Sequence, residues 1–529
     1  MFSMRLNHVV LVLALFFSGL TDRALALSLP HIFASHMVLQ RDMPVRVWGK
    51  AQANSTVFVF FQKQRSITVA DNKGDWATWL QPLEANATGQ TLTVLGDGIE
   101  IKFEDVLVGE VWLCSGQSNM EYPVRGLKEI DTLIAEASDA QLRLCEVGRN
   151  YAATPQSDTY IRWAVSEGKT IPGFSAVGYY FGKFLRQELG VPVGLIRAAW
   201  GGTPCEAWTS AKALNANPKL ESVKQLWQKQ VDSYDQRLAK WKVASQKAYE
   251  KQVQWLKDHP DEDPQIAQKK FRIPRQPFAP DATPFAPSVL FNGMISPVFP
   301  MSMRGAIWYQ GEANGGRPDE YRTLLPTMIQ DWRARLFPNK LHFGIVQLAN
   351  WRPPLDHSQP PEDAGWAHLR DAQKYTAELM PNVGMATIID IGEKFDIHPK
   401  NKRDVGKRLS LWALHDVYGK AVRHTGPVFD TYEIKDGRIF LIFNQVGSGL
   451  TTSDGKPITE CIIADEDRKW HWAQAKITSR NTLEVWADAV PNPIAVRYAW
   501  ASNPDQANLT NDIGLPASPF RTDDWLFGH

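Results

Sequence analysis

Five short apolar runs alternate with helix-like segments after about residue 106, and this alternation constrains the fold more than any other feature. The runs are Val106–Cys114, Val193–Trp200, Ala306–Tyr309, Phe343–Leu348 and Met385–Ile389. The helix-like segments are Ala176–Leu189, Tyr321–Leu336, Ala367–Met380 and Lys402–Tyr418. Strands that alternate with helices along a chain form a parallel sheet wrapped by those helices. We therefore expect an α/β fold, with an α/β domain over residues 106–424.

Two flanking regions and one internal segment have a different pattern. Residues 27–105 and 425–529 contain short strand-like runs separated by Gly, Asn, Asp and Pro, which predicts an N-terminal β-sandwich and a C-terminal β-rich module. Residues 211–275 are rich in Lys, Gln, Ala and Glu and predict a helical insertion. Its charges most simply form a solvated helix face, and a lid or substrate wall is the weaker alternative. The total length of 529 residues fits about three domains.

The first 26 residues have the pattern of a secretory signal peptide. The apolar run Val9–Leu20 is followed by Ala24-Leu25-Ala26, a small-x-small cleavage site. The run is too short for a transmembrane helix, which needs about 20 apolar residues. We expect export to the periplasm or the extracellular space, with no membrane span in the mature chain.

Composition argues against several kinds of partner. The 58 Lys and Arg residues balance 57 Asp and Glu residues, so no nucleic-acid partner is expected. The four cysteines match no zinc spacing, no convincing His/Asp ligand cluster stands out, and neither a metal nor a cofactor is expected. The cysteines could form a disulfide or stay as buried free thiols, and the sequence does not decide between the two. It also does not indicate the oligomeric state. Most of the 20 Trp residues should lie in the core, with a few lining a glycan site.

Ser118 follows the first apolar run at the point where a central strand should end. Open parallel sheets place their active sites at the carboxyl ends of strands. Gly116 permits a tight turn, after which a serine hydroxyl can face a substrate. The alternative is that Ser118 only caps the next helix, and from this segment alone that alternative is favoured.

Residues that could take part in catalysis also follow three of the other apolar runs. Gly201 and Gly202 follow the second run and can bring a backbone N–H close to a ligand, although a plain turn is the alternative. Gln310 follows the third run and supplies a neutral amide donor. Asp396 and His398 follow the last run, where a histidine could take a proton from Ser118. A nucleophile, a base and oxyanion donors together meet the needs of acyl transfer.

Four motifs now give a specific resemblance. Gly116-Gln117-Ser118-Asn119-Met120, Gly201-Gly202-Thr203, Trp308-Tyr309-Gln310-Gly311-Glu312 and Asp396-Ile397-His398-Pro399 resemble the sialate O-acetylesterase family, a branch of the SGNH hydrolase superfamily. The resemblance implies a flavodoxin-like α/β core and a serine esterase that removes acetyl groups from sugars through an acetyl-serine. It implies that Ser118 is the nucleophile and His398 the base, with Asp396 as its partner. The implied oxyanion donors are Ser118, Gly201 or Gly202, and Gln310.

One position departs from the superfamily pattern. The wider superfamily usually has two residues between the aspartate and the histidine, whereas only Ile397 stands between Asp396 and His398 here. We favour Asp396 as the partner, and Asp390 or a backbone carbonyl is the alternative.

The substrate also stays open at this level. O-acetylated sialic acid should require an arginine for its carboxylate, and Arg125, Arg352 and Arg370 lie near candidate loops. The alternatives are an acetylesterase for plant cell-wall polysaccharide, such as xylan or xyloglucan, and a non-catalytic glycan-binding protein of the cell envelope.

Overall fold

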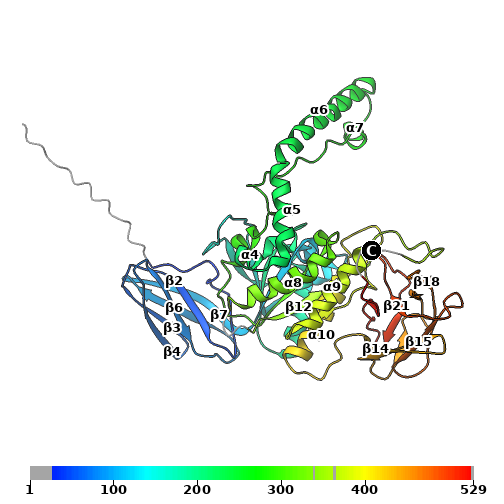
Figure 1. The fold of residues 1–529 in the computed structure, drawn as a ribbon. Coiled ribbons are helices and arrows are strands. Elements are labelled where there is room, and N and C mark those ends of the chain that lie inside the picture. The colour runs from blue at the N-terminus through cyan, green and yellow to red at the C-terminus, as the bar shows by residue number, and fades with distance from the viewer. Residues whose placement is uncertain (1–26, 337–339, 362–364, 526–529) are drawn as a thin grey trace, which may run out of the picture.

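The computed structural model describes residues 27–336, 340–361 and 365–525. The predicted signal peptide at residues 1–26 lies outside these ranges. Figure 1 shows a central α/β region with β structure on either side, blue at the N-terminal end and orange to red at the C-terminal end, and a long helical arm that projects from the centre. The fold is therefore mixed α/β with additional β modules, as the sequence predicts.

The central sheet is large and mixed. Its order is β13 (Val383–Ala386), β12 (His342–Val346), β11 (Gly305–Tyr309), β7 (Ile99–Gly116), β10 (Val193–Ala199), β8 (Asp139–Val147) and β9 (Ile161–Ser166). All neighbours are parallel except β8 and β9. Each of the five apolar runs contributes to a strand of this sheet, although β13 ends at Ala386 rather than at Ile389. The pair β8–β9 was not expected from the apolar runs. It lies at the edge of the sheet, where part of its surface is exposed.

The main helices pack against this sheet. They are α3 (Ala176–Leu189), α8 (Pro318–Arg333), α9 (Gly365–Leu379) and α10 (Lys402–Trp412), with the short α1 (Ser118–Glu121) and α2 (Ile130–Ala135). Helix α3 begins where the Ser175 hydroxyl accepts a hydrogen bond from the Gly178 N–H and ends at Gly190, which has a φ of 68°. A Cβ on Gly406 would lie 2.6 Å from Tyr180 Cβ, so α10 approaches α3 closely only because glycine stands there. The core contains several fully buried tryptophans in edge-to-face contact, such as Trp308 and Trp332.

The N-terminal β structure shares a strand with the central sheet. Strands β1 (Val38–Gln40), β3 (Thr56–Phe61), β4 (Gln64–Val69) and β6 (Asn86–Gly96) join β7 directly or through one another, and β2 (Val45–Lys50) pairs with β5 (Asp75–Leu80). Buried and exposed residues alternate along β3, as they do in a strand with one face on a core. The predicted division at residue 105 falls inside β7, which runs without a break into the α/β region.

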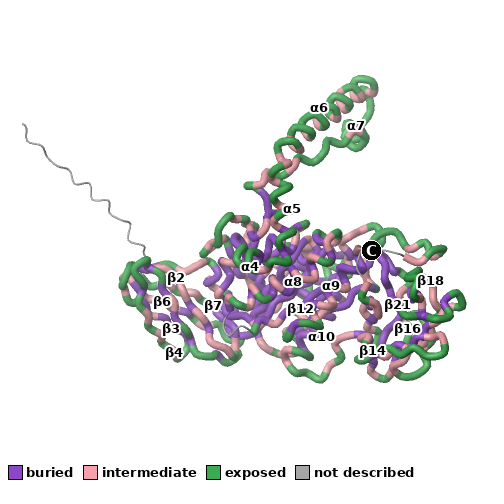
Figure 2. The backbone as a smooth tube through the Cα atoms, in the orientation of Figure 1, coloured by how far each residue is buried: buried purple, intermediate pink, exposed green. Residues whose placement is uncertain are grey.

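The helical arm consists of α5 (Glu221–Asp232), α6 (Tyr234–Asp258) and α7 (Pro264–Lys270), while the preceding α4 (Ala211–Ala216) lies on the central region in contact with α8 (Figure 1). Figure 2 shows that α6 and α7 are exposed along most of their length, and α6 has no buried residue. A helix that is polar on nearly every side does not pack into a core. None of the described helices is long and apolar enough to cross a membrane.

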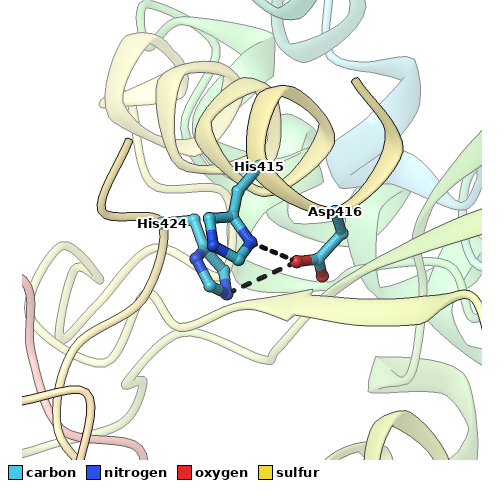
Figure 3. A group of neighbouring side chains, drawn as sticks. All are labelled: His415, Asp416 and His424. Carbon is cyan, nitrogen blue, oxygen red and sulfur yellow. Dashed lines mark hydrogen bonds and ion pairs between the residues drawn. The ribbon is translucent and has the colours of Figure 1, made fainter. Parts of the chain in front are cut away.

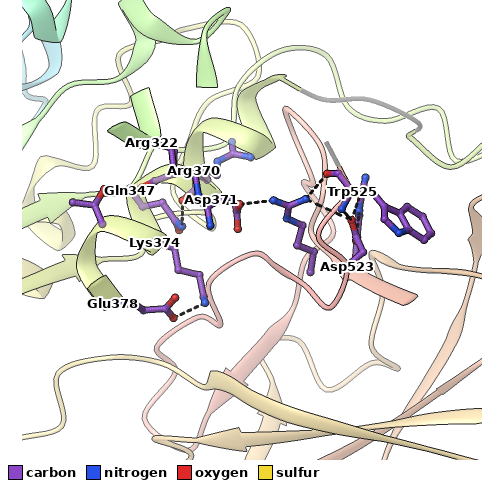
Figure 4. Close-up of polar contacts among 12 residues, drawn as sticks. Arg322, Gln347, Arg370, Asp371, Lys374, Glu378, Asp523 and Trp525 are labelled. Carbon is purple, nitrogen blue, oxygen red and sulfur yellow. Dashed lines mark hydrogen bonds and ion pairs between the residues drawn. The ribbon is translucent and has the colours of Figure 1, made fainter. Parts of the chain in front are cut away.

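The C-terminal β structure docks on α8 and α9 through charged groups (Figure 4). Its strands are β14 (Val428–Lys435), β15 (Arg438–Asn444), β16 (Leu450–Thr452), β17 (Cys461–Ala464), β18 (His471–Trp472), β19 (Gln474–Ile477), β20 (Thr482–Trp486), β21 (Ala495–Tyr498), β22 (Leu509–Asn511) and β23 (Phe520–Arg521). Asp371 on α9 accepts hydrogen bonds from Arg521, at 3.1 Å, and from Arg322 on α8, at 2.8 Å. The fully buried Arg370 donates to the carbonyl oxygens of Ala501 and Ser502. Arg370 therefore joins the two parts of the chain and does not face a substrate.

Candidate active site

Three neighbouring strands end at the same level, and Gly116 lies at the middle of the three ends. Ala199 of β10 and Tyr309 of β11 are both in register with Gly116 of β7. Gly116 has a φ of 139°, and a Cβ there would lie 2.2 Å from the Tyr309 carbonyl oxygen. Only glycine fits this position, because the strand turns sharply against its neighbour. The turn places Ser118 at the start of α1, at the carboxyl end of the sheet.

Ser118 and His398 are in direct contact. His398 Nε2 lies 2.9 Å from Ser118 Oγ, within hydrogen-bond distance. His398 belongs to the loop between β13 and α10, so the contact joins residues 280 positions apart. Burial and the nearby charge of Lys402 lower the pKa of His398, which favours the neutral imidazole that a general base requires.

Asp396 contacts His398 in two ways. Its Oδ1 accepts the backbone N–H of His398 at 2.8 Å and lies 3.4 Å from the imidazole Nδ1. Its Oδ2 accepts a hydrogen bond from Lys400 at 2.7 Å, and this bond is the main reason why the pKa of Asp396 is lowered. Asp390, the alternative partner, instead forms a two-point ion pair with Arg408. Of the two carboxylates, Asp396 is therefore the one placed to orient the imidazole.

Two of the predicted oxyanion donors, Gly201 and Gln310, already have acceptors. The Gly201 N–H donates to Glu121 Oε2 at 2.9 Å, and a Cβ on Gly201 would lie 3.4 Å from Ser118 Cβ. Gln310 is fully buried. Its Nε2 donates to Asn314 Oδ1 at 2.7 Å and, through a longer contact of 3.3 Å, to the Thr203 carbonyl. The structure thus groups Ser118, His398 and Gly201 most closely and holds Gln310 in a buried hydrogen-bond network.

A second buried network lies beside the Ser118–His398 pair and was not expected from the sequence. Asn119 Nδ2 donates to Glu312 Oε1 at 2.6 Å and to the Ile397 carbonyl at 2.9 Å, while Asn119 Oδ1 accepts from Lys402. Burial lowers the pKa of Lys402 to about 7 and raises the pKa of Glu312. This network fixes the residue just before His398. Asn119 and Glu312 stand inside motifs noted in the sequence, but nothing in the sequence singled out Lys402.

Ser118 and His398 open into a cavity of about 680 Å³. Its charged lining residues are Glu121, Arg125, Glu146, Arg149 and Arg197. Arg149 pairs with Glu121 and Arg197 pairs with Glu146, whereas Arg125 has no ion pair or hydrogen bond with any described residue. The third arginine considered from the sequence, Arg352, lies against the Trp351 ring and outside this cavity.

Among the described residues, only one group of three side chains could hold a metal ion together, and it lies outside this cavity. His415, Asp416 and His424 come together just after α10 (Figure 3). His415 Nδ1 lies 2.6 Å from Asp416 Oδ1, and the two histidine rings stack at 3.9 Å. The four cysteines are buried free thiols, which decides between the two alternatives left open for them.

Comparison with known proteins identifies the family. Residues 108–259 match the family model of the sialic acid-specific acetylesterases, a group of carbohydrate esterases. The chain is 29% identical to the sialate O-acetylesterase of Rattus norvegicus and 28% identical to that of Homo sapiens, over 92% of both chains in each case. The crystal structure of a carbohydrate acetylesterase from Xanthomonas citri is 36% identical, with a TM-score of 0.77 over 94% of this chain and all of that one. The chain therefore belongs to the sialate O-acetylesterase family of carbohydrate esterases and is a carboxylic ester hydrolase.

Proposed function

We propose that this protein is an exported carbohydrate O-acetylesterase that works through an acetyl-Ser118 intermediate. The observation that carries the proposal is the 2.9 Å contact between Ser118 Oγ and His398 Nε2, at the carboxyl end of the sheet and open to a cavity. A nucleophile and a base in hydrogen-bond contact are the minimum for nucleophilic ester cleavage.

The proposed reaction has two steps. Ser118 Oγ attacks the acetyl carbonyl while its proton passes to His398 Nε2, and the sugar alkoxide leaves with that proton. Water then gives a proton to His398 and attacks the acetyl-serine, which releases acetate and returns the proton to Ser118. The negative oxygen in each step would be held by the N–H of Ser118, by Gly201 or Gly202, and by Gln310. Gln310 could donate the hydrogen that now makes the longer contact with Thr203.

The sheet topology supports an SGNH-type core. Strand β8 is parallel to β10 and carries the antiparallel β9 at the edge; the other five strands stand in the order β10-β7-β11-β12-β13. Numbered along the chain, this order is 2-1-3-4-5, which is the flavodoxin-like order. We assign residues 106–424 to this domain, residues 27–105 and 425–529 to the β modules, and residues 1–26 to a signal peptide that directs export to the periplasm or the extracellular space.

The charge of the cavity favours an acidic sugar such as sialic acid. Arg149 and Arg197 are each paired with a glutamate, but Arg125 is not paired with any residue in the described part of the chain. A free guanidinium can bind a substrate carboxylate through two parallel hydrogen bonds. Arg125 is therefore the residue that would distinguish a sialic acid from a neutral sugar.

Acetate release from a panel of substrates tests the proposal. The panel sets O-acetyl sialic acids against acetylated xylan, xyloglucan and mannan, with wild type and Ser118→Ala compared on each. We expect release from O-acetyl sialic acids, no release by Ser118→Ala, and a wild-type protein that gains the mass of one acetyl group at Ser118 when quenched. Release only from the plant glycans would replace the sialate assignment, and full activity of Ser118→Ala would remove the nucleophile.

A further inference from the structure

A second cavity lies at the base of the helical arm. It has a volume of about 340 Å³ and lies between α5, the returning segment after α7, and the α/β region. Its aromatic lining residues are Trp227, Phe278 and Phe285, and its polar lining includes Glu206, Gln230, Arg237, Thr283 and Arg317. Phe278 is 47% exposed although it is a large apolar side chain. An exposed aromatic ring at the mouth of a polar-floored cavity is typical of a ligand site.

This cavity adjoins the catalytic one. Gly201 lies beside Ser118, and a Cβ on the next residue, Gly202, would lie 3.7 Å from the Phe285 ring. The Phe285 ring is thus on the order of 10 Å from the Ser118 side chain, because adjacent Cα atoms are about 3.8 Å apart. The Gly201–Gly202 turn thus lies between Ser118, which lines the catalytic cavity, and Phe285, which lines the second one.

The floor of the second cavity is polar, and its groups are hydrogen-bonded to one another. Arg317 Nη2 donates to Glu206 Oε1 at 2.6 Å, and Asn314 Nδ2 donates to Glu206 Oε2 at 2.9 Å. Asn314 also accepts the hydrogen bond from Gln310 described above. The floor is therefore connected to the predicted oxyanion donor through a single residue.

We propose that this second cavity is a binding subsite for a sugar of the same glycan chain that carries the acetyl ester at Ser118. A sugar ring presents an apolar C–H face and a rim of hydroxyls. The aromatic rings of Trp227 and Phe278 can stack on the apolar face of the sugar. The hydroxyls can form hydrogen bonds with polar side chains of the lining, which are Glu206, Gln230 and Arg237. The arm thereby makes the protein an esterase for oligosaccharides or polysaccharides rather than for free monosaccharides. This inference rests on the proposed esterase function.

Matched substrate pairs test the subsite. The pairs are O-acetylated xylo-oligosaccharide against O-acetylated xylose, and O-acetyl sialyllactose against O-acetyl sialic acid. We expect the wild type to prefer the longer member of at least one pair in kcat/KM. Phe278→Ala should lower kcat/KM on that substrate by about tenfold, because an aromatic stacking contact is lost. Its activity on the monosaccharide and on p-nitrophenyl acetate should not change.

Two comparisons separate a subsite from a structural effect. Tyr249→Ala is the matched control, since Tyr249 is an exposed aromatic residue on α6 that does not line the cavity. It should keep the wild-type preference. An active wild type without preference in either pair, a preference that survives Phe278→Ala and Trp227→Ala, or an equal loss on all substrates would overturn the subsite. Failure of the wild type to release acetate from any of these substrates would instead remove the proposed function.

Discussion

The substitution Asp396→Asn tests how strongly the carboxylate supports His398. In a fully coupled catalytic triad, the same change costs about 10⁴ in kcat. Here the distance from Asp396 Oδ1 to the imidazole Nδ1 is 3.4 Å, which is longer than the usual hydrogen bond. The Asp396 side chain is 39% exposed, and its other oxygen is bound to Lys400.

These features predict a moderate loss. An exposed ion pair contributes about 0.2–1 kcal/mol. The asparagine oxygen can still accept the His398 N–H, but the loss of the charged acceptor weakens this hydrogen bond by about 1 kcal/mol. Together they correspond to a loss of about 7–30-fold in kcat/KM, at about 1.4 kcal/mol per factor of ten. The assay is hydrolysis of p-nitrophenyl acetate over a range of pH, with Ser118→Ala as the blank.

The pH profile gives an independent readout of the same substitution. Asp396 raises the pKa of His398, so removing its charge lowers that pKa. The imidazole would then stay neutral to lower pH, and the acidic limb of the kcat/KM profile should move to lower pH. A loss of about 10⁴ or more would refute the argument from distance and exposure, because it would indicate a tightly coupled triad. An acidic limb that does not move would contradict the influence of the Asp396 charge on His398.

Three other substitutions have definite expected outcomes. Lys402→Met removes a charge that lowers the pKa of His398, so the acidic limb of the kcat/KM profile should move to higher pH. This shift is opposite to the one expected for Asp396→Asn, and an unchanged limb would contradict it. Gln310→Ala should lower kcat by about 10²–10³ if Gln310 donates to the oxyanion, and it should lower the free energy of unfolding by about 1–3 kcal/mol through the lost buried hydrogen bonds. A stability loss measured by denaturant titration with kcat unchanged would make Gln310 purely structural. Gly116→Ala should lower both Tm and activity, because its Cβ would overlap the Tyr309 carbonyl; wild-type values of both would contradict the turn geometry.

The sequence predicts the position of the site because parallel sheets obey a simple rule. Apolar runs mark the strands, and polar residues that follow them must meet at one edge of the sheet. Ser118 and Gly201 follow this rule, since their strands end in register at Gly116. The edge pair β8–β9 was missed for the same reason. In β8 the buried stretch 142–145 is interrupted by Arg143, and only half of the β9 residues are buried, so neither strand has the continuous apolar run of an interior strand.

The connections between the site residues could not be predicted. Lys402 opens α10, and in the sequence it is one more lysine at the start of a helix. Its effect on His398 depends on burial and on Asn119, 283 positions earlier in the chain. Arg370 shows the opposite case. Its place near a candidate loop suggested a substrate contact, whereas the fold buries it against backbone carbonyls.

A motif can place a donor, but it cannot say whether that donor is free. The Gly201 N–H lies beside Ser118, where the sequence expects it, yet it is bound to the Glu121 carboxylate. Glu121 is in turn held by Arg149, which lies over the Trp200 ring at 5.4 Å. For Gly201 to bind an oxyanion, this carboxylate must turn away, since two negative groups cannot share one N–H without repulsion. The arginine-held Glu121 therefore occupies the Gly201 N–H and would have to be displaced before Gly201 could act in the proposed oxyanion site.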